Sequence, residues 1–367
     1  MGSFRCLSVL VISAVVLLFN SPVAQCGCYK RIFSFGDSII DNGNFVFAIG
    51  KGQSALKETP FGMTFFHHPT GRVSDGRVLI DFYSQALQLP LIPPGLPEKN
   101  TGQFPTGANF AVFASTALPG SYFKPYNFSL PTGWNLGGQI DWFKQIDYPL
   151  HDSFDLSGDK KKILGESLIV LGEIGGNEYN FWFGARRPRE QAYKFIPDVV
   201  ACIGGFAQEL INLGAKTIMV PNNFPIGCVP AYLNGFGGPE EPRDEHQCLR
   251  WFNDFSSRHN DALRGEVNRL KAKNPGVKLI YADYFGAAME FVKTPAKFGI
   301  GDPLVACCGG NNKYHTNDGC NRTTKLWGNP ANFASWDGMH MTEKAYQVIS
   351  DGVLKGPFAD PQLLKTC

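Results

Sequence analysis

The sequence lacks an excess of charge of either sign. Lysine and arginine total 34 against 32 aspartate and glutamate residues, which gives the 367-residue chain a formal net charge of +2 at pH 7. A nucleic-acid-binding protein usually carries a strongly basic patch, and this balance leaves no such footprint, so we expect no nucleic-acid partner. Internal repeats and low-complexity tracts are missing as well, while 44% of the residues are hydrophobic, so the composition predicts a globular protein with a sizeable core.

Long hydrophobic runs are also missing, apart from a short one at residues 7–19. Arg5 precedes this run and small or polar residues follow it, which is the pattern of a secretory signal peptide. The run is too short to favour a spanning helix, which needs roughly 20 apolar residues. We therefore expect residues 1–26 to be a signal peptide, with an uncleaved signal anchor as the alternative. The mature protein, without a stable membrane anchor, is expected outside the cell or in the cell wall, or in the Golgi lumen if it is retained.

Cysteine usage agrees with secretion. The cysteines are Cys6, Cys26, Cys28, Cys202, Cys228, Cys248, Cys307, Cys308, Cys320 and Cys367. In an oxidising compartment most of them should pair, so we expect several disulfide bonds, although the sequence does not set their connectivity. Because Cys307 and Cys308 are adjacent, we expect them to bond to separate partners.

Metal-binding patterns are scarce. No CxxC pair or His–Cys spacing suggests zinc, and the adjacent His67 and His68 should point their side chains apart. We therefore expect neither a metal site nor a cofactor. Two Asn-x-Ser/Thr sequons, at Asn127 and Asn321, predict glycosylation if the protein is secreted.

Short apolar runs alternate with longer amphipathic stretches along the chain. The runs, each about the length of a buried strand, are residues 31–35, 109–113, 167–171, 216–220 and 277–281. The amphipathic stretches are residues 74–89, 190–213, 248–273 and 342–354. Strands that alternate with helices predict an α/β fold in which helices cover both faces of a parallel sheet. No linker divides the chain, so we expect residues 27–367 to form a single domain.

Residues suited to nucleophilic catalysis lie near both ends of this pattern. Ser38 follows the first predicted strand, and parallel α/β sheets bind ligands at the carboxyl ends of their strands. Asp337 and His340 precede the last predicted helix, at a spacing that lets the carboxylate reach one ring nitrogen while the other faces outward. Each motif alone has a plainer interpretation: a turn for Gly-Asp-Ser, and a capping aspartate with a surface histidine for Asp-x-x-His. Together they suggest a Ser–His–Asp triad.

Donors for an oxyanion could come from two further strand ends. Asn177 follows a Gly-Gly turn after the third predicted strand, where its side-chain amide could reach a developing negative charge. The second predicted strand could offer a backbone N–H from its end. Both could equally be ordinary turns that follow a strand.

Six ordered segments of the chain resemble those of plant GDSL esterases/lipases, in the SGNH hydrolase superfamily. The segments are residues 35–44 (FGDSIIDNGN), 69–77 (PTGRVSDGR), 175–177 (GGN), 220–228 (with VP and FPIGC), 306–309 (ACCG) and 336–343 (WDGMHMTE), so the resemblance runs through almost the whole mature chain. It implies a flavodoxin-like three-layer α/β/α sandwich with a central parallel five-stranded sheet. It also implies a carboxylic ester hydrolase.

The resemblance assigns roles to the candidate residues. Ser38 is the implied nucleophile, His340 the base and Asp337 the carboxylate that orients the base. The implied oxyanion donors are the Ser38 N–H, the Asn177 side chain and the Ala114 N–H.

Two positions depart from the family's pattern. Ala114 stands where the family has glycine, and its backbone N–H survives the change unless the turn needs a positive φ. Glu178 stands where the family has an aspartate that supports Asn177 from behind, so the longer side chain could shift the amide.

These features predict a secreted serine ester hydrolase that acts through an acyl-enzyme on a small-molecule or polysaccharide ester. No lid-like amphipathic helix is evident, which favours short acyl groups, acetyl above all, for example on a cell-wall polysaccharide such as xylan. Three alternatives stay open. They are acyl transfer to an alcohol at the same site, a lipase or phenolic-ester esterase, and a catalytically weak carbohydrate-binding protein, which the two departures would suit. The sequence leaves the oligomeric state undetermined.

Overall fold

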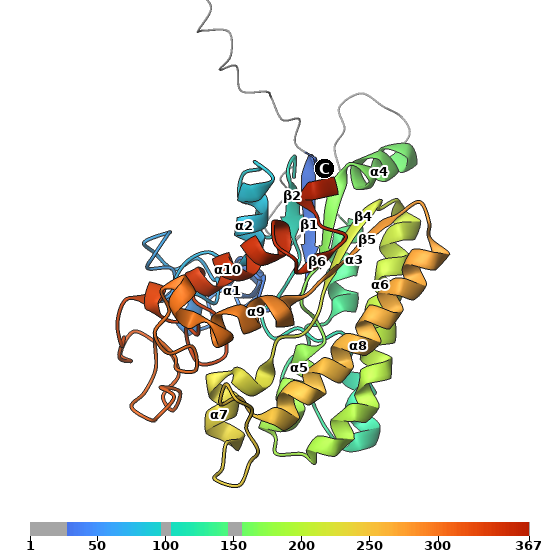
Figure 1. Ribbon diagram of the computed structural model, residues 1–367. Helices are drawn as coiled ribbons and strands as arrows, with labels where there is room; N and C mark the ends of the chain where they lie inside the picture. Colours follow the sequence, from blue (N-terminus) through green and yellow to red (C-terminus); the bar gives the residue numbers. More distant parts are fainter. Residues whose placement is uncertain (1–27, 97–103, 146–155, 367) are drawn as a thin grey trace, which may run out of the picture.

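The computed structural model describes residues 28–96, 104–145 and 156–366. The predicted signal peptide, residues 1–26, lies outside the described residues, as does Cys367. The described chain is arranged around one sheet with helices on both of its faces (Figure 1).

Five parallel strands form most of the sheet. They are β1 (Arg31–Phe35), β2 (Gly107–Asn109), β3 (Ser167–Leu171), β4 (Thr217–Pro221) and β5 (Lys278–Ala282), in the order β2-β1-β3-β4-β5. The predicted parallel α/β sheet is confirmed, with one correction: a sixth strand, β6 (Ala359–Asp360), pairs antiparallel with β5 at the edge. A strand of two residues is too short to leave a hydrophobic pattern, so nothing in the sequence marks it.

Alternate strand residues face two different hydrophobic layers. Phe33 and Phe35 of β1 belong to one core, whereas Ile32 belongs to the other. The helices of the first layer are α3 (Leu136–Gln145), α4 (Leu156–Gly165), α5 (Gly176–Gly184), α6 (Ile196–Leu213) and α8 (Arg250–Lys273). The helices of the second layer are α2 (Leu79–Ala86), α9 (Tyr284–Lys293) and α10 (Glu343–Leu354). The architecture is therefore a three-layer α/β/α sandwich, to which two short helices, α1 (Asn44–Ala48) and α7 (Pro230–Phe236), are added.

The amphipathic stretch predicted at residues 190–213 is divided. A 3₁₀ segment, Arg189–Phe195, precedes α6. This helix has a proline in its first turn and ends at Leu213, and Gly214, with φ 120°, follows it. By length and composition alone, Arg189–Leu213 could cross a membrane. In the fold, however, α6 is a core helix whose Val199, Ile203 and Leu210 are buried in the first layer.

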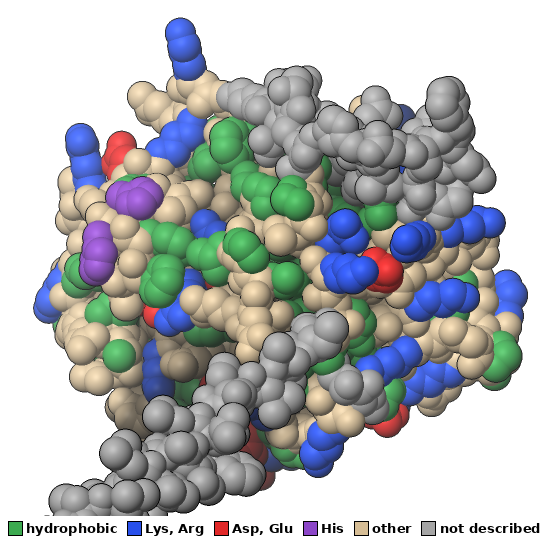
Figure 2. Space-filling view, turned by 90° about the horizontal axis from the view of Figure 1, so that it is seen from above, with side chains coloured by type: hydrophobic (Ala, Val, Ile, Leu, Met, Phe, Trp, Pro, Cys, Tyr) green, Lys and Arg blue, Asp and Glu red, His purple; other side chains and the backbone are tan. Residues whose placement is uncertain are grey.

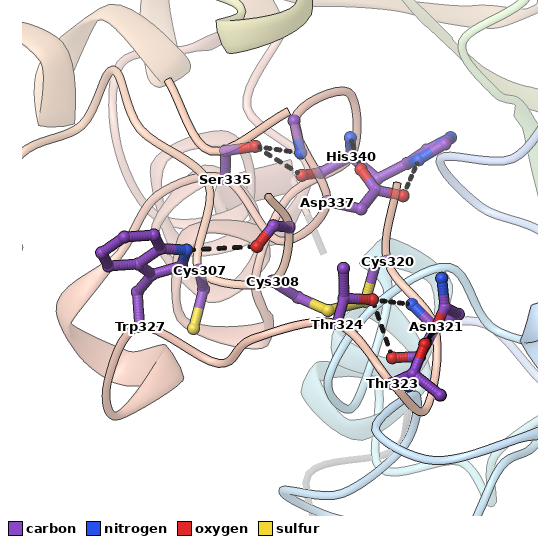
Figure 3. The surroundings of a disulfide bond; sticks show 12 residues. Cys307, Cys308, Cys320, Asn321, Thr323, Thr324, Trp327, Ser335, Asp337 and His340 are labelled. Atoms are coloured by element: carbon purple, nitrogen blue, oxygen red, sulfur yellow. Dashed lines mark hydrogen bonds and ion pairs between the residues drawn. A yellow bond between two sulfur atoms is a disulfide. The ribbon is translucent and has the colours of Figure 1, made fainter. Parts of the chain in front are cut away.

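The disulfide bonds correct one prediction. Cys228 bonds to Cys248 and Cys308 bonds to Cys320, but Cys307 is a buried free thiol. Figure 3 shows the Cys307 sulfur directed away from the Cys308–Cys320 bridge, and its Sγ lies 3.7 Å from the Gly328 carbonyl oxygen. Adjacent residues of an extended segment point to opposite sides, so only one of the two thiols reaches Cys320.

Two other cysteines, outside these pairs, also have assigned states. Cys28 is disulfide-bonded, and Cys202 is a half-buried free thiol.

Basic side chains are prominent on one face of the molecule. On the face drawn in Figure 2, lysine and arginine side chains are more evident than aspartate and glutamate, and they are most frequent on the right of the view, with uncharged side chains between them. Asn127 is exposed and Asn321 is partly exposed, so both sequon asparagines lie at the surface. Glycosylation of either one stays a prediction.

Candidate active site

Ser38 lies in a tight turn at the carboxyl end of β1. Gly36 opens this turn with φ 141°, and a Cβ there would lie only 3.0 Å from the Glu173 carbonyl oxygen, so the turn needs glycine. The Asp37 carboxylate accepts a hydrogen bond from the Ile39 N–H at 3.0 Å and closes the turn. The turn leaves the Ser38 hydroxyl at the wall of a cleft, with only 6% of the residue exposed.

The loop before α10 brings a histidine and an aspartate to this hydroxyl. His340 Nε2 lies 2.9 Å from Ser38 Oγ, and His340 Nδ1 lies 2.7 Å from Asp337 Oδ2. The other carboxylate oxygen, Asp337 Oδ1, accepts hydrogen bonds from the Met339 and His340 N–H groups at 2.9 and 2.7 Å. Figure 3 shows the two side chains meeting on this loop. The three residues predicted from the Gly-Asp-Ser and Asp-x-x-His motifs are therefore brought together in space.

The electrostatics of this loop favour an ionised aspartate. Burial alone would raise the pKa of Asp337, but the charge of His340 and the hydrogen bonds from it hold that pKa below its ordinary value. Burial alone would lower the pKa of His340, but the Asp337 carboxylate outweighs it and the pKa is raised. The imidazole is therefore set up to accept a proton at Nε2 while Nδ1–H donates to the carboxylate.

Asn177, in the first turn of α5, is held by two acceptors. Its Nδ2 donates to Asp37 Oδ2 at 2.8 Å and to the Ser115 carbonyl oxygen at 2.9 Å. Both amide hydrogens are therefore occupied, and an oxyanion would have to replace one of these two acceptors. Asn177 lines the same cleft as Ser38.

Ala114 adopts a left-handed backbone conformation. Its φ is 65°, in the region that favours glycine, so the turn does have the positive φ that an alanine resists. The neighbouring N–H groups are engaged, since Phe113 N donates to Asp41 Oδ2 at 2.8 Å and Ser115 N donates to the Val112 carbonyl oxygen at 3.1 Å. Among the described residues, no acceptor is paired with the Ala114 N–H itself.

Glu178 does not support Asn177 from behind, so that implied role is corrected. Its Oε1 accepts a hydrogen bond from the Leu118 N–H at 2.9 Å, and its Oε2 has no partner among the described residues. Burial raises the pKa of Glu178 to about 7. The longer glutamate side chain reaches the segment after β2 rather than the neighbouring amide, and the contact that orients Asn177 comes from Asp37 instead.

A pair of buried carboxyl groups lies beside the nucleophile, and sequence reasoning missed it. Asp37 and Glu173 are in hydrogen-bond contact, and both line the cleft. Burial raises the pKa of Asp37 to about 6. Burial and the charge of Asp37 raise the pKa of Glu173 well above its ordinary range. Two like charges in contact do not both persist in a buried site, so the pair holds a proton to a higher pH than an isolated carboxyl group would. One feature of the sequence could have predicted this pair: each acid follows a strand, and the carboxyl ends of these two strands, β1 and β3, lie side by side in the sheet.

Other acidic and imidazole groups near these motifs have structural roles. Asp41 accepts hydrogen bonds from the Gly43, Asn44 and Phe45 N–H groups and so holds the start of α1. His67 and His68 are exposed, and each Nδ1 lies against a nearby carbonyl oxygen. In the described part of the chain, no group of three potential ligands could hold a metal ion.

The cleft above Ser38 opens to solvent and encloses about 60 Å³ of space that water-sized molecules can occupy. One wall holds the polar groups, including Ser38, Asn177 and His340. Apolar side chains form much of the rest, and the sequence reasoning had placed none of them at the site: Ile39, Phe224, Ile226, Val229, Met339 and Met341. A mainly apolar cleft with a few convergent polar groups is typical of a small-molecule site.

Comparison with known proteins agrees with this geometry. Residues 32–353 match the family model described as GDSL-like Lipase/Acylhydrolase. GDSL esterase/lipase At1g28600 of Arabidopsis thaliana is 39% identical, over 100% of this chain and 94% of the relative. Two further Arabidopsis thaliana proteins, GDSL esterase/lipase At1g31550 and At1g28590, are 39% and 40% identical. These matches cover 98% and 97% of this chain and 92% and 90% of the relatives.

Proposed function

Because the chain belongs to the GDSL-like lipase/acylhydrolase family and is a carboxylic ester hydrolase, we propose that Ser38 is its nucleophile, His340 its general base and Asp337 the carboxylate that orients the base. The observation that carries the proposal is one continuous hydrogen-bonded chain. It runs from Ser38 Oγ through the imidazole to Asp337 Oδ2, with distances of 2.9 and 2.7 Å.

The reaction follows from this chain of contacts. Ser38 Oγ attacks the ester carbonyl carbon while its proton moves to His340 Nε2, and the carbonyl electron pair moves onto oxygen. When the tetrahedral intermediate collapses, the C–O bond to the alcohol breaks and His340 returns the proton to the leaving oxygen. Water then attacks the acyl carbon while His340 Nε2 takes its proton. When the second tetrahedral intermediate collapses, the bond between Ser38 Oγ and the acyl carbon breaks, the acid leaves, and His340 returns the proton to Ser38 Oγ. Asp337 stays ionised and stabilises the imidazolium in both halves.

The developing oxyanion needs donors, and three are proposed. They are the Ser38 N–H, the Ala114 N–H and the Asn177 amide. The Ala114 N–H is supported by its lack of a partner among the described residues. The Asn177 amide would exchange its bond to the Ser115 carbonyl oxygen for one to the oxyanion while it keeps its bond to Asp37. One such donor is worth roughly 10²–10³ in kcat in other acyl-transfer enzymes.

The substrate is proposed to carry a short acyl group, acetyl above all. A cell-wall polysaccharide such as xylan, triacylglycerols and phenolic esters are the substrates to compare. The proposed setting is the secretory pathway, supported by disulfide bonds such as Cys228–Cys248 and by surface-exposed sequon asparagines. An assembled Ser–His–Asp arrangement argues against a catalytically weak carbohydrate-binding protein.

A direct assay tests the proposal. The mature protein should hydrolyse p-nitrophenyl acetate, and Ser38→Ala should not, although its Tm stays within a few degrees of wild type. Full activity in Ser38→Ala would overturn the assignment of the nucleophile.

Adding an acceptor alcohol and looking for the transferred ester separates hydrolysis from acyl transfer, because water and alcohols compete for the same acyl-enzyme. A screen of acetylated xylan, triacylglycerols and phenolic esters then ranks the substrate classes.

A further inference from the structure

A buried glutamate, Glu173, lies beside the nucleophile, and the reaction steps described above do not use it. It follows β3, is only 5% exposed and lines the cleft that holds Ser38. Its carboxyl group is in hydrogen-bond contact with the Asp37 carboxyl and accepts from the Gly176 N–H. A Cβ at Gly176 would lie 2.6 Å from Glu173 Oε1, so the glycine leaves the room that this carboxyl occupies. Glu173 therefore connects the turn that carries Ser38 with the first turn of α5.

Both contacts of Glu173 lead to Asn177. Asp37 Oδ2 accepts a hydrogen bond from Asn177 Nδ2 at 2.8 Å, and Gly176 is the residue that precedes Asn177 in α5. Glu173 thus touches the side chain that holds the amide and the backbone that carries it. A change in the Glu173 carboxyl would reach the amide by both routes.

The hydrogen bonds around Asp37 decide which acid of the pair carries the proton. Asp37 already accepts with both oxygens, from the Ile39 N–H at 3.0 Å and from Asn177 Nδ2 at 2.8 Å. A carboxylate that only accepts needs a donor at its third contact, and a glutamate can donate only when it carries a proton. One Glu173 oxygen accepts from the Gly176 N–H, which leaves the other for the O–H. Every contact is satisfied when a neutral Glu173 donates to an ionised Asp37.

The surroundings of the pair do not balance a second negative charge. In the described part of the chain, no lysine or arginine forms an ion pair with either carboxyl. The other titratable groups that act on the pair are Asp41, Glu178, His340, Tyr179, Tyr232, Tyr284 and Tyr346. Burial raises the pKa of each tyrosine, so these four stay uncharged, and only His340 can become positive. An ionised Glu173 would add a negative charge close to the place where the oxyanion develops.

We propose that Glu173 is a positioning residue for the oxyanion site: its neutral carboxyl group donates to Asp37, which holds one Asn177 N–H so that the other can face the oxyanion. The inference deepens the proposed function and rests on the donor role of Asn177. A catalytic group misplaced by 1 Å can cost about 10² in rate. Because the oxyanion contact belongs to the transition state, its loss should appear in kcat and leave KM nearly unchanged.

Two substitutions separate the hydrogen bond from the volume of the side chain. Glutamine keeps a donor for Asp37 and an acceptor for the Gly176 N–H, so Glu173→Gln should keep kcat within about threefold of wild type at the pH of maximal activity. Leucine fills similar space without a donor, so Glu173→Leu should lower kcat by about 10- to 100-fold with KM within about twofold. Hydrolysis of p-nitrophenyl acetate measures both. Wild-type kcat in Glu173→Leu, or equal losses in the two variants, would overturn the inference.

The pH profile of kcat is a readout that packing alone would not move. As pH rises and Glu173 ionises, the wild-type kcat should fall, whereas Glu173→Gln should lose this alkaline fall and keep the acid limb that His340 sets. Glu178→Gln is the matched control, since Glu178 is a buried neighbouring carboxyl that does not line the cleft, and it should keep the wild-type fall. Coincident alkaline limbs in wild type and Glu173→Gln, or a limb lost in Glu178→Gln instead, would overturn the inference. If Glu173→Leu does not fold, these profiles decide alone.

A double variant tests whether Glu173 acts through Asn177. In the Asn177→Ala background the positioned group is gone, so Glu173→Leu should lower kcat by less than about twofold further. The full additional loss in that background would place the effect elsewhere and overturn the inference. Failure of the proposed function gives a different result: the wild-type protein would turn over esters no faster than Ser38→Ala.

Discussion

The two halves of the active site hold their carboxyl groups in opposite ways. On the base side, burial is outweighed by His340 and by two backbone N–H groups, so the pKa of Asp337 is lowered. On the oxyanion side, burial dominates, so the pKa values of Asp37, Glu173 and Glu178 are all raised. The Asp337 carboxylate on the base side is therefore ionised, whereas the carboxyl groups on the oxyanion side retain protons at pH values where such groups are normally ionised.

The two halves also differ in how they are assembled. The base side is one short loop in which the Asp337 carboxylate accepts hydrogen bonds from the backbone N–H and the imidazole of His340. The oxyanion side joins the ends of β1 and β3 with the segment that follows β2, and Asn177 connects Asp37 to Ser115 across them. Removing the Ser38 hydroxyl should therefore remove chemistry with little loss of stability, whereas Asp337→Ala should also lower stability, because the Asp337 carboxylate holds two backbone N–H groups of the loop. Changes on the oxyanion side should affect both.

The largest expected effect is on the base side. Ser38→Ala, His340→Ala and Asp337→Ala should each lower kcat by several orders of magnitude, because the three groups act as one unit. For the same reason the double variant of Ser38 and His340 should be no slower than the worse single variant. Esterase kinetics with a Tm for each protein check this. A double variant whose loss equals the product of the two single losses would contradict the triad.

The next effect is on the oxyanion side. Asn177→Ala should lower kcat by roughly 10²–10³, since an oxyanion donor is removed. It should also lower Tm, because a buried side chain with two hydrogen bonds is lost. Asn253→Ala is the matched control, because Asn253 is a buried asparagine that accepts from the Gly227 N–H at 2.9 Å and does not line the cleft. Asn253→Ala should lower Tm alone, and equal kcat values for the two variants would remove Asn177 from the donor set.

The same contrast explains what could be predicted from the sequence. Asp-x-x-His is a local motif, so the spacing of Asp337 and His340 already encodes their contact. Alternating hydrophobic runs likewise encode the parallel sheet and its two helix layers. The two-residue β6 and the split before α6 leave no periodic signal, so they were missed or misplaced.

The oxyanion side was harder to predict because its contacts join distant segments. The resemblance placed the support of Asn177 at position 178, where a glutamate could shift the amide, whereas the Asn177 amide donates to Asp37, 140 positions away. Which of two adjacent thiols, Cys307 or Cys308, reaches Cys320 depends on the path of the loop, which no spacing rule supplies.

A smaller effect should appear in the pH dependence of stability. The folded-state pKa of Glu178 is raised from 4.5 to about 7, so the fold is most stable with this carboxyl protonated. Its stabilisation is fully present below the unfolded pKa and is lost as pH rises through about 7, by up to about 3 kcal/mol. Glutamine cannot ionise, so the unfolding free energy of Glu178→Gln should increase relative to that of wild type between pH 5 and pH 8. Unfolding free energies of both proteins at the two pH values check this. An equal change in the two proteins would show that Glu178 does not titrate in this range.

The smallest expected effect separates backbone conformation from chemistry at Ala114. Its φ of 65° costs an alanine about 1 kcal/mol, which Ala114→Gly would relieve. Glycine also has more freedom in the unfolded chain, which costs about 0.4–1 kcal/mol, so the two contributions nearly cancel and Tm should change little. The N–H is retained, so kcat should be kept or raised.

Ala114→Val is the opposing variant, because a β-branched residue at positive φ is strongly disfavoured. It should lower Tm and kcat together as the turn shifts. An Ala114→Gly enzyme that loses tenfold or more in kcat at unchanged Tm would mean that the alanine methyl, and not only its N–H, contributes to catalysis.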